Sequence, residues 1–262
     1  MDTIIYLFIK INVDMPDFDE QWEKVLDKEY FEKDNEQFEN NEKNIEKFLK
    51  LTGIKKINDK NYFNEKNCLD AGCGPGRWTF AMQQLGFKKV DSFDISPEAI
   101  KICKKINPNA YVFNIFDLKK NPIYDFVFSW GVLHHTENTR KAFSKVASQV
   151  KKGGRLHIMV YDKKFDSDYD GYRGNTCVEK HKVWEKLSFD EKIKMCDNKV
   201  KTNGGNIHGW FDAFNPKYNW SYESDEVKKW FEEEGFKQIK LRKKTHFNSI
   251  PTSQINITGL KI

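Results

Sequence analysis

From residue 67 onward, short apolar runs that predict strands alternate with amphipathic segments that predict helices. The helix expected near residue 76, for example, places Trp78, Ala81 and Leu85 among polar neighbours. The expected strands are 67–72, 89–94, 110–115, 124–130 and 154–161, and the expected helices are 76–86, 97–106 and 138–151. Such alternation predicts an α/β fold, in which a parallel sheet carries helices on both faces.

The pattern differs on either side of this region. Residues 17–51 have apolar positions at helical spacing, and we interpret 1–61 as an N-terminal helical extension whose last part, 53–61, is a linker. That extension either covers a ligand site or merely covers one side of the core. Residues 62–262 then form the main domain.

After residue 161 the alternation stops. Residues 162–221 are polar, rich in glycine, aspartate and aromatic residues, and contain one clear predicted helix near 178–195. A long insertion of this kind is usually functional or disordered. The pattern resumes with a helix at 223–235, and two consecutive strands at 236–244 and 254–262 predict an antiparallel hairpin at the sheet edge. The sequence KKGG at 151–154 predicts the C-cap of the helix before the fifth strand.

Composition narrows the class of protein. A charged fraction of 32% and a mean hydropathy of −0.75 exclude a membrane-spanning protein, and the apolar run 3–13 is too short to span a bilayer. We interpret that run as an edge strand or a tail, with Met15 as an alternative start. The net charge is +5, but lysines alternate with acids, so a nucleic-acid partner is not indicated. Five cysteines without a C-x-x-C pair favour reduced thiols and a cytoplasmic protein.

The stretch NCLDAGCGPGR, residues 67–77, is the strongest local signal in the chain. A strand ending near Asp70 enters a turn with three glycines, which suits a backbone that turns with positive φ or lies against a ligand. A helix follows, and its free N–H groups favour an electron-rich ligand. Asp94 closes the next strand about 20 residues later, where nucleotide sites place a carboxylate on ribose hydroxyls. Arg77 occupies the place of the third glycine in a dinucleotide fingerprint, so a dinucleotide is not expected.

The segment LDAGCGPG resembles motif I of class I S-adenosylmethionine-dependent methyltransferases, and FDIS resembles the acidic end of their second strand. The resemblance continues in YDFVFSWGVLHHT (124–136), in KAFSKVASQVKKGGRLHIMVY (141–161), and in FNPKYNWSYESDEVKKWFEEEGF (214–236), which is similar to one branch of small-molecule methyltransferases. The resemblance implies a Rossmann-like, mostly parallel seven-stranded sheet with an antiparallel C-terminal hairpin, N-terminal helices and a cap insertion after the fifth strand.

The resemblance also implies the residues that hold the cofactor, S-adenosyl-L-methionine. Asp94 would bind the ribose and Ile95 would lie against the adenine. For the adenine amine, Asn114 stands where the family commonly has an acid, and Asp117 is the alternative. The methionine part would contact Asp70, Gly72, Gly74 and Gly76, and the remaining cofactor contacts would come from Cys73, Ile115, Phe116, Ser129, Trp130 and Gly131.

Methyl transfer from a sulfonium requires alignment of donor and acceptor, and often the removal of one proton from the acceptor. His134 and His135 are the candidate catalytic residues because a histidine can take that proton. The alternatives are that His135 packs structurally while His134 faces the substrate, or that neither does chemistry. The candidate acceptor-binding residues are Tyr161, Arg173, His208, Trp210, Asp212 and Tyr218. No spacing of potential ligands predicts a metal site.

The sequence therefore predicts a methyltransferase that acts on the hydroxyl or amine of a small molecule, a sugar or a secondary metabolite among them. RNA or protein methylation is a second hypothesis, against which the chain lacks a basic aromatic strip and an N/D-P-P-Y/F motif. A non-catalytic cofactor-binding subunit is a third. The oligomeric state and the acceptor atom are left open by the sequence, because many acceptors share such a scaffold.

Overall fold

A central sheet organises the computed structural model, which describes residues 21–22, 42–54, 63–242 and 254–262. The predictions for 3–13 and Met15, and most of those for 17–51 and 53–61, lie outside the described residues. The strands are β1 (Asn67–Ala71), β2 (Lys89–Asp94), β3 (Tyr111–Val112), β4 (Tyr124–Trp130), β5 (Val150–Asp162), β6 (Ser221–Tyr222), β7 (Phe236–Arg242) and β8 (Gln254–Lys261). Their order is β3-β2-β1-β4-β5-β8-β7, with β6 beside β5.

The first five strands are parallel, and β7 and β8 form the antiparallel C-terminal pair. The expected Rossmann-like α/β fold is thereby confirmed. Within the described residues the sheet has eight strands instead of seven, because β6 pairs with the end of β5. The chain runs from β1 outward to β3 and then crosses to β4. In open α/β sheets, ligands bind at such a reversal, beyond the carboxyl ends of the strands.

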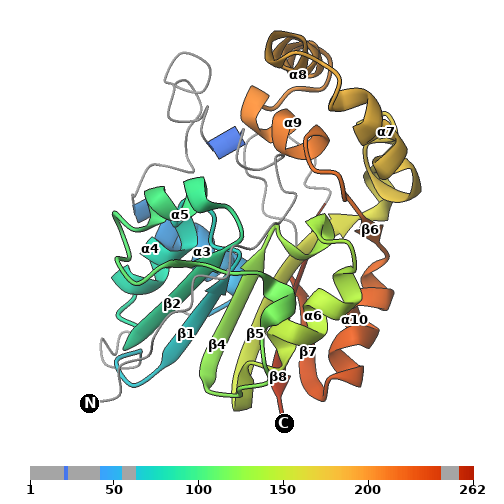
Figure 1. The fold of residues 1–262 in the computed structure, drawn as a ribbon. Helices are drawn as coiled ribbons and strands as arrows, with labels where there is room; N and C mark the ends of the chain where they lie inside the picture. The colour runs from blue at the N-terminus through green and yellow to red at the C-terminus, as the bar shows by residue number, and fades with distance from the viewer. Residues whose placement is uncertain (1–20, 23–41, 55–62, 243–253) are drawn as a thin grey trace.

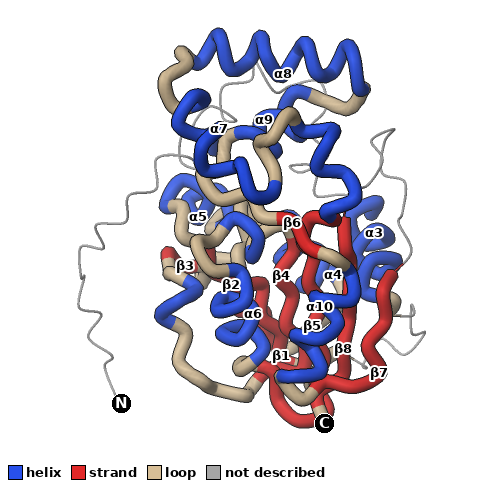
Figure 2. Tube along the Cα trace, turned by 90° about the vertical axis from the view of Figure 1, so that its right-hand side faces the viewer, coloured by secondary structure: helices blue, strands red, loops and turns tan. Residues whose placement is uncertain are grey.

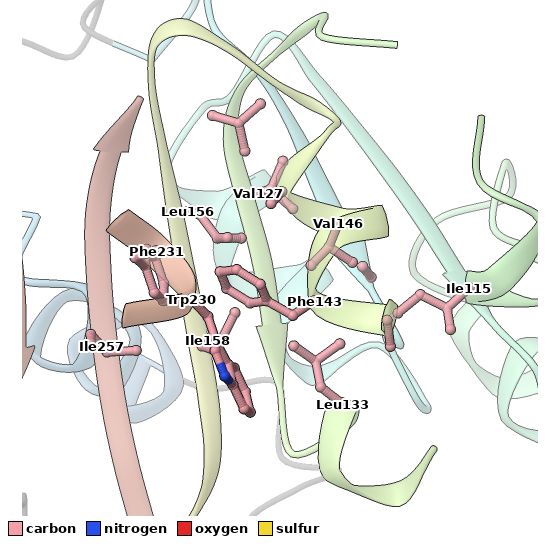
Figure 3. Close-up of a cluster of buried hydrophobic side chains, with 14 of the residues drawn as sticks. Ile115, Val127, Leu133, Phe143, Val146, Leu156, Ile158, Trp230, Phe231 and Ile257 are labelled. Carbon is pink, nitrogen blue, oxygen red and sulfur yellow. The ribbon is translucent and has the colours of Figure 1, made fainter. Parts of the chain in front are cut away.

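Both faces of the sheet are covered, which explains the nearly continuous apolar runs of its central strands. On one face lie α3 (Glu42–Thr52), α4 (Arg77–Gln84) and α5 (Pro97–Cys103); on the other lie α6 (Thr139–Ala147) and α10 (Ser224–Glu233) (Figure 1). Phe48 of α3 packs against Trp78 and Phe128, so this helix belongs to the core. On the opposite face, Phe143 and Phe231 meet over the sheet (Figure 3).

Two predicted boundaries in the sheet are wrong. Helix α6 ends at Ala147, and 151–154 are part of the β5 segment, where the register shifts between Tyr124 and Phe126. A Cβ at Gly154 would lie 2.9 Å from the carbonyl oxygen of Tyr124, so this glycine allows close backbone approach and does not cap a helix. The third strand covers only 111–112, because Asn114 caps a short 3-10 helix, η1 (Ile115–Asp117), by accepting a hydrogen bond from the Phe116 N–H at 2.9 Å.

Residues 163–220, which we call the cap, lie beyond one end of the sheet (Figures 1 and 2). The prediction of one helix near 178–195 is wrong. The cap contains the 3-10 helices η3 (Lys163–Tyr169) and η4 (Gly174–Thr176) and the α-helices α7 (Cys177–Trp184), α8 (Phe189–Asn203) and α9 (Ile207–Phe214). Ser188 separates α7 from α8 by a reciprocal capping box with Glu191. The cap has its own apolar core around Trp184, Phe211 and Phe214.

Asn219 connects two segments of this core by hydrogen bonds. Its side chain is fully buried and donates to the carbonyl oxygens of Tyr172 at 2.8 Å and Ala213 at 2.5 Å. We expect Asn219→Ala to lower the free energy of unfolding by about 2–3 kcal/mol, because two buried carbonyls would lose their donors. Urea unfolding measures this change, and Asn198→Ala on the exposed face of α8 is the control. Equal destabilisation by both variants would contradict the prediction.

Within the described residues, no helix combines the length and hydrophobicity needed to cross a bilayer.

Candidate active site

The glycine loop, residues 72–76, connects β1 to α4. Gly72, Gly74 and Gly76 have φ values of 79°, 51° and 99°, which other residues rarely adopt. The N–H groups of Gly72 and Cys73 both donate to the carbonyl oxygen of Phe93 at 2.9 Å, and this ties the loop to β2. The three glycines are therefore required by the backbone of the turn itself.

Asp94 ends β2 directly beside this loop. Its carboxylate accepts hydrogen bonds from the Gly74 N–H at 2.8 Å and from the Ser96 N–H at 3.0 Å. A carboxylate offers about four lone-pair positions, so both oxygens can accept further donors such as ribose hydroxyls. Ile95, half-buried, follows it in the chain.

Asp70, at the end of β1, is a buried carboxyl group with 1% of its surface exposed. Burial raises its pKa to about 7, while a hydrogen bond from Thr79 acts in the opposite direction and the nearby Asp94 raises the pKa further. Thr79 Oγ1 donates to Asp70 Oδ2 at 2.7 Å. A buried carboxyl group with so high a pKa would be stabilised in its ionised form by a cation. Together with the glycine loop and Asp94, it fits the amino acid and ribose groups of S-adenosylmethionine.

The predicted cofactor contacts that follow the third strand and end the fourth are mostly engaged with the protein itself. Asn114 already uses its side-chain oxygen as a local cap, and the alternative, Asp117, is exposed. Ser129 Oγ donates to the carbonyl oxygen of Ala71 at 2.9 Å, and Trp130 Nε1 donates to Asn256 Oδ1 at 3.0 Å. The remaining predicted residues differ in burial: Ile115 is buried in the core, Phe116 is half-buried, Gly131 lies in the turn after β4, and Cys73 is buried against Cys103.

The two candidate catalytic histidines lie in η2 (Leu133–His135), directly after β4. Their rings are 4.0 Å apart, and the ring of His134 lies 3.9 Å from that of Tyr161 at the end of β5. His135 Nδ1 is 3.1 Å from the carbonyl oxygen of Tyr218. Because a carbonyl only accepts, this contact places the proton on Nδ1 and the lone pair on Nε2.

Both histidines are strongly shielded from water. Burial is the main reason that the pKa of His134 is well below 6.5. Repulsion between a protonated His134 and a protonated His135, and then the charge of Arg173, lower it further. Burial lowers the pKa of His135 to about 3. The hydrogen bond to Tyr218 raises this pKa, and the charge of Arg173 lowers it. Both imidazoles are therefore neutral near pH 7. Their catalytic role stays a prediction.

Arg173 enters the same cluster from the cap. Its guanidinium carbon lies 3.4 Å from the ring centres of both Tyr161 and Tyr169, so the cation is held between two aromatic faces. The side chain is 5% exposed. Its charge acts on both histidines and also on the carboxyl groups of Asp166 and Asp212.

Asp212 approaches this cluster from α9. Burial raises its pKa to about 6, while a hydrogen bond from Gln21 and the charge of Arg173 oppose the effect. Gln21 Nε2 lies 3.5 Å from Asp212 Oδ1. Trp22 follows Gln21, and its ring would lie 3.7 Å from a Cβ placed on Gly74. Residues 21–22 therefore bridge the cap and the glycine loop.

The structure separates the other predicted acceptor-binding residues. The ring of His208 lies 5.9 Å from that of Trp22, on the side of the glycine loop. Tyr218 joins the histidine cluster through its backbone carbonyl. Trp210 is buried in the core of the cap, where its indole N–H donates to the carbonyl oxygen of Gly204 at 2.8 Å. Sequence reasoning missed Gln21, Trp22 and Tyr169, because the apolar spacing of 17–51 indicates a helix and gives no sign of a contact with the glycine loop.

Comparison with known proteins points to one family. A sequence model described as a methyltransferase domain matches residues 33–241. Curated relatives include the mitochondrial ubiquinone biosynthesis O-methyltransferase of Schizosaccharomyces pombe, 33% identical over 107 residues that cover 37% of this chain and 39% of the relative. The tRNA U34 carboxymethyltransferase of Campylobacter hominis is 25% identical over 118 residues, covering 42% of this chain and 40% of the relative. The chain thus spans about two-fifths of the length of these relatives.

Solved structures share the fold at low sequence identity. Magnesium protoporphyrin IX methyltransferase from Synechocystis PCC 6803, with SAH bound, has a TM-score of 0.50 and 13% identity, covering 84% of this chain and 83% of that chain. The YcgJ protein from Bacillus subtilis has a TM-score of 0.50 and 13% identity, covering 84% of this chain and 99% of that chain.

Proposed function

We propose that this chain, which belongs to the methyltransferase domain family, is an S-adenosylmethionine-dependent methyltransferase and that its acceptor is a small molecule bound between the end of the sheet and the cap. One observation carries the proposal. His134, His135, Tyr161 and Arg173 converge from η2, β5 and the cap, and each is 8% exposed or less. Polar groups enclosed among aromatic rings are typical of small-molecule sites.

We assign the cofactor to the carboxyl ends of β1 and β2. The glycine loop and Asp70 would hold the amino acid part, and Asp94 would hold the ribose. When bound, S-adenosylmethionine supplies a methyl group activated by a positively charged sulfur. The protein's own task is to orient the acceptor, exclude water and receive the acceptor's proton. In this proposal the histidine pair borders the transferred methyl group.

The enclosed cluster favours a small acceptor over RNA or a protein side chain, since a macromolecule requires a wide accessible surface. Relatives named as tRNA-modifying enzymes keep RNA methylation as the alternative. All five cysteines are free thiols, which is consistent with a cytoplasmic location in this proposal.

We expect Asp94→Ala to weaken S-adenosylmethionine binding by about 1–3 kcal/mol, because hydroxyl groups and two backbone N–H groups would lose a charged acceptor. Isothermal titration calorimetry measures the dissociation constant. The control is Asp91→Asn on the same strand, since Asp91 instead accepts from the Tyr124 hydroxyl at 2.9 Å.

The same titration with NAD distinguishes two cofactor classes. Arg77 has its Nε 2.9 Å from Asn44 Oδ1 and stands where a dinucleotide site needs glycine. We therefore expect no binding of NAD. Binding of NAD without binding of S-adenosylmethionine, or an Asp94→Ala variant with unchanged affinity, would contradict the assignment.

A further inference from the structure

Asp212, on α9, interacts with residues from two different parts of the candidate site. Through Gln21 it is joined to the segment whose Trp22 lies against the glycine loop. On its other side it acts electrostatically on Tyr161, at the end of β5. The carboxyl group therefore lies between the region assigned to the methyl donor and the aromatic cluster assigned to the acceptor.

The other candidate proton acceptors are less suitable. His134 is fully buried between the rings of His135 and Tyr161, and His135 is directed by the carbonyl of Tyr218. Burial lowers the pKa values of both imidazoles so far that transfer of a proton to either ring is costly. Asp212, with a pKa of about 6, is ionised at neutral pH and close to the range in which a general base works best.

The charges around Asp212 limit the chemistry of the acceptor. The charge of Arg173 acts on both Asp212 and Asp166, the charge of Lys163 also acts on Asp166, and Tyr161 and the histidines are neutral at pH 7. His208, one turn earlier on α9, is also neutral, because burial lowers its pKa to about 4. An anionic acceptor would lie directly beside the ionised carboxylate of Asp212, and two like charges in contact are unfavourable in a buried site.

Amines are also disfavoured. An alkylammonium ion has a pKa near 10, so a carboxylate with a pKa of about 6 would hold it as an ion pair and leave no nitrogen lone pair for attack. A hydroxyl group is different, because its oxygen keeps lone pairs while its hydrogen is donated to a carboxylate.

From this arrangement we propose that the acceptor group is a hydroxyl and that Asp212 receives its proton; this rests on the function proposed above. The acceptor oxygen forms a bond to the methyl carbon as the carbon–sulfur bond breaks, and the sulfur retains the electron pair. The hydroxyl proton passes to an Asp212 carboxylate oxygen and is later released to water. The charge of Arg173 favours the ionised form of Asp212.

The test compares wild-type protein with Asp212→Asn, each saturated with S-adenosylhomocysteine, the demethylated cofactor product. Phenol is the hydroxyl probe, and anisole, benzylamine and benzoate are probes of the same size with no donor, a cation and an anion. Asp190→Asn, on the exposed start of α8, is the control variant. Calorimetric titrations at pH 6 in two buffers of different ionisation enthalpy give both affinity and proton release.

We expect phenol to bind the wild-type complex at least tenfold more tightly than the other three probes. Binding should release up to about half a proton, because the donated hydrogen bond favours the ionised carboxylate of a group that is half protonated near pH 6. Asp212→Asn should bind S-adenosylhomocysteine normally, bind phenol at least tenfold more weakly and release no proton. Asp190→Asn should behave as the wild type.

With S-adenosylmethionine and phenol, we expect Asp212→Asn to form anisole at least about a hundredfold more slowly than the wild type. Equal rates, including no anisole from either protein, would overturn the proposal, as would phenol binding without proton release. If the wild-type complex bound benzoate or benzylamine more tightly than phenol, the hydroxyl assignment would be overturned. Failure of the wild type to bind S-adenosylhomocysteine would instead overturn the proposed function itself.

Discussion

At pH 8 and without cofactor, Asp70→Asn is expected to have a free energy of unfolding about 4 kcal/mol higher than that of the wild type. The carboxyl group has a pKa of about 7 when folded and an ordinary value of 3.8, and each unit of difference corresponds to about 1.4 kcal/mol. Between these values the folded protein binds more protons than the unfolded chain. The wild type therefore loses stability as the pH rises from about 4 to about 7, whereas the amide does not titrate.

Urea unfolding at pH 3.5 and pH 8 measures this difference, which should be small at the lower pH and complete at the higher one. The amide oxygen can still accept the hydrogen bond from Thr79, so packing is preserved. S-adenosylmethionine should bind the variant more weakly, because its ammonium group would lose a charged partner. A variant that is less stable than the wild type at pH 8 would show that Asp70 is ionised in the free protein and already paired.

The second large effect concerns the core. Phe143 of α6 is fully buried, and its ring centre lies 5.0 Å from that of Phe231 and 5.8 Å from that of Trp230 (Figure 3). Phe143→Ala should lower the free energy of unfolding by about 3–5 kcal/mol, because the removed ring leaves a cavity between α6, α10 and the sheet.

Chemical denaturation of Phe143→Ala is best compared with Val183→Ala, since Val183 is 56% exposed on α7. The control should change stability by less than about 0.5 kcal/mol. A loss of less than about 1 kcal/mol for Phe143→Ala would mean that the neighbouring rings collapse into the space.

The sequence predicts well those parts of the fold that depend on residues close together in the chain. The glycine loop requires positive φ at three places, and Asp94 follows at the end of the next apolar strand, so both could be located without a structure. The parallel sheet follows from the alternation of strands and helices. The class of cofactor came from the resemblance of these segments to a known family.

The cap was harder to predict because its contacts join distant segments. Gln21 and Asp212 are 191 residues apart in sequence, so no local pattern could bring them together. The helix α8 was predicted as part of a single longer helix, because the Ser188 capping box was not recognised as a boundary. The glycine pair at 153–154 was interpreted as a helix cap, although Gly154 lies against the carbonyl oxygen of Tyr124, where the register between β4 and β5 shifts.

The pairing of β6 with the end of β5 has a consequence for how such an enzyme can acquire new specificity. Tyr161 and Asp162, where the chain leaves for the cap, are paired with Ser221 and Tyr222, where it returns. Strands paired in this way lie about 4.8 Å apart, so a segment of any length can be exchanged between these points without moving the sheet. If the cap binds the acceptor as proposed above, grafting a different segment at this junction would replace the residues that the cap contributes and leave Asp70 and Asp94 in place. On the proposed assignment, the acceptor-binding segment can therefore be exchanged in laboratory libraries while the cofactor-binding strands are kept.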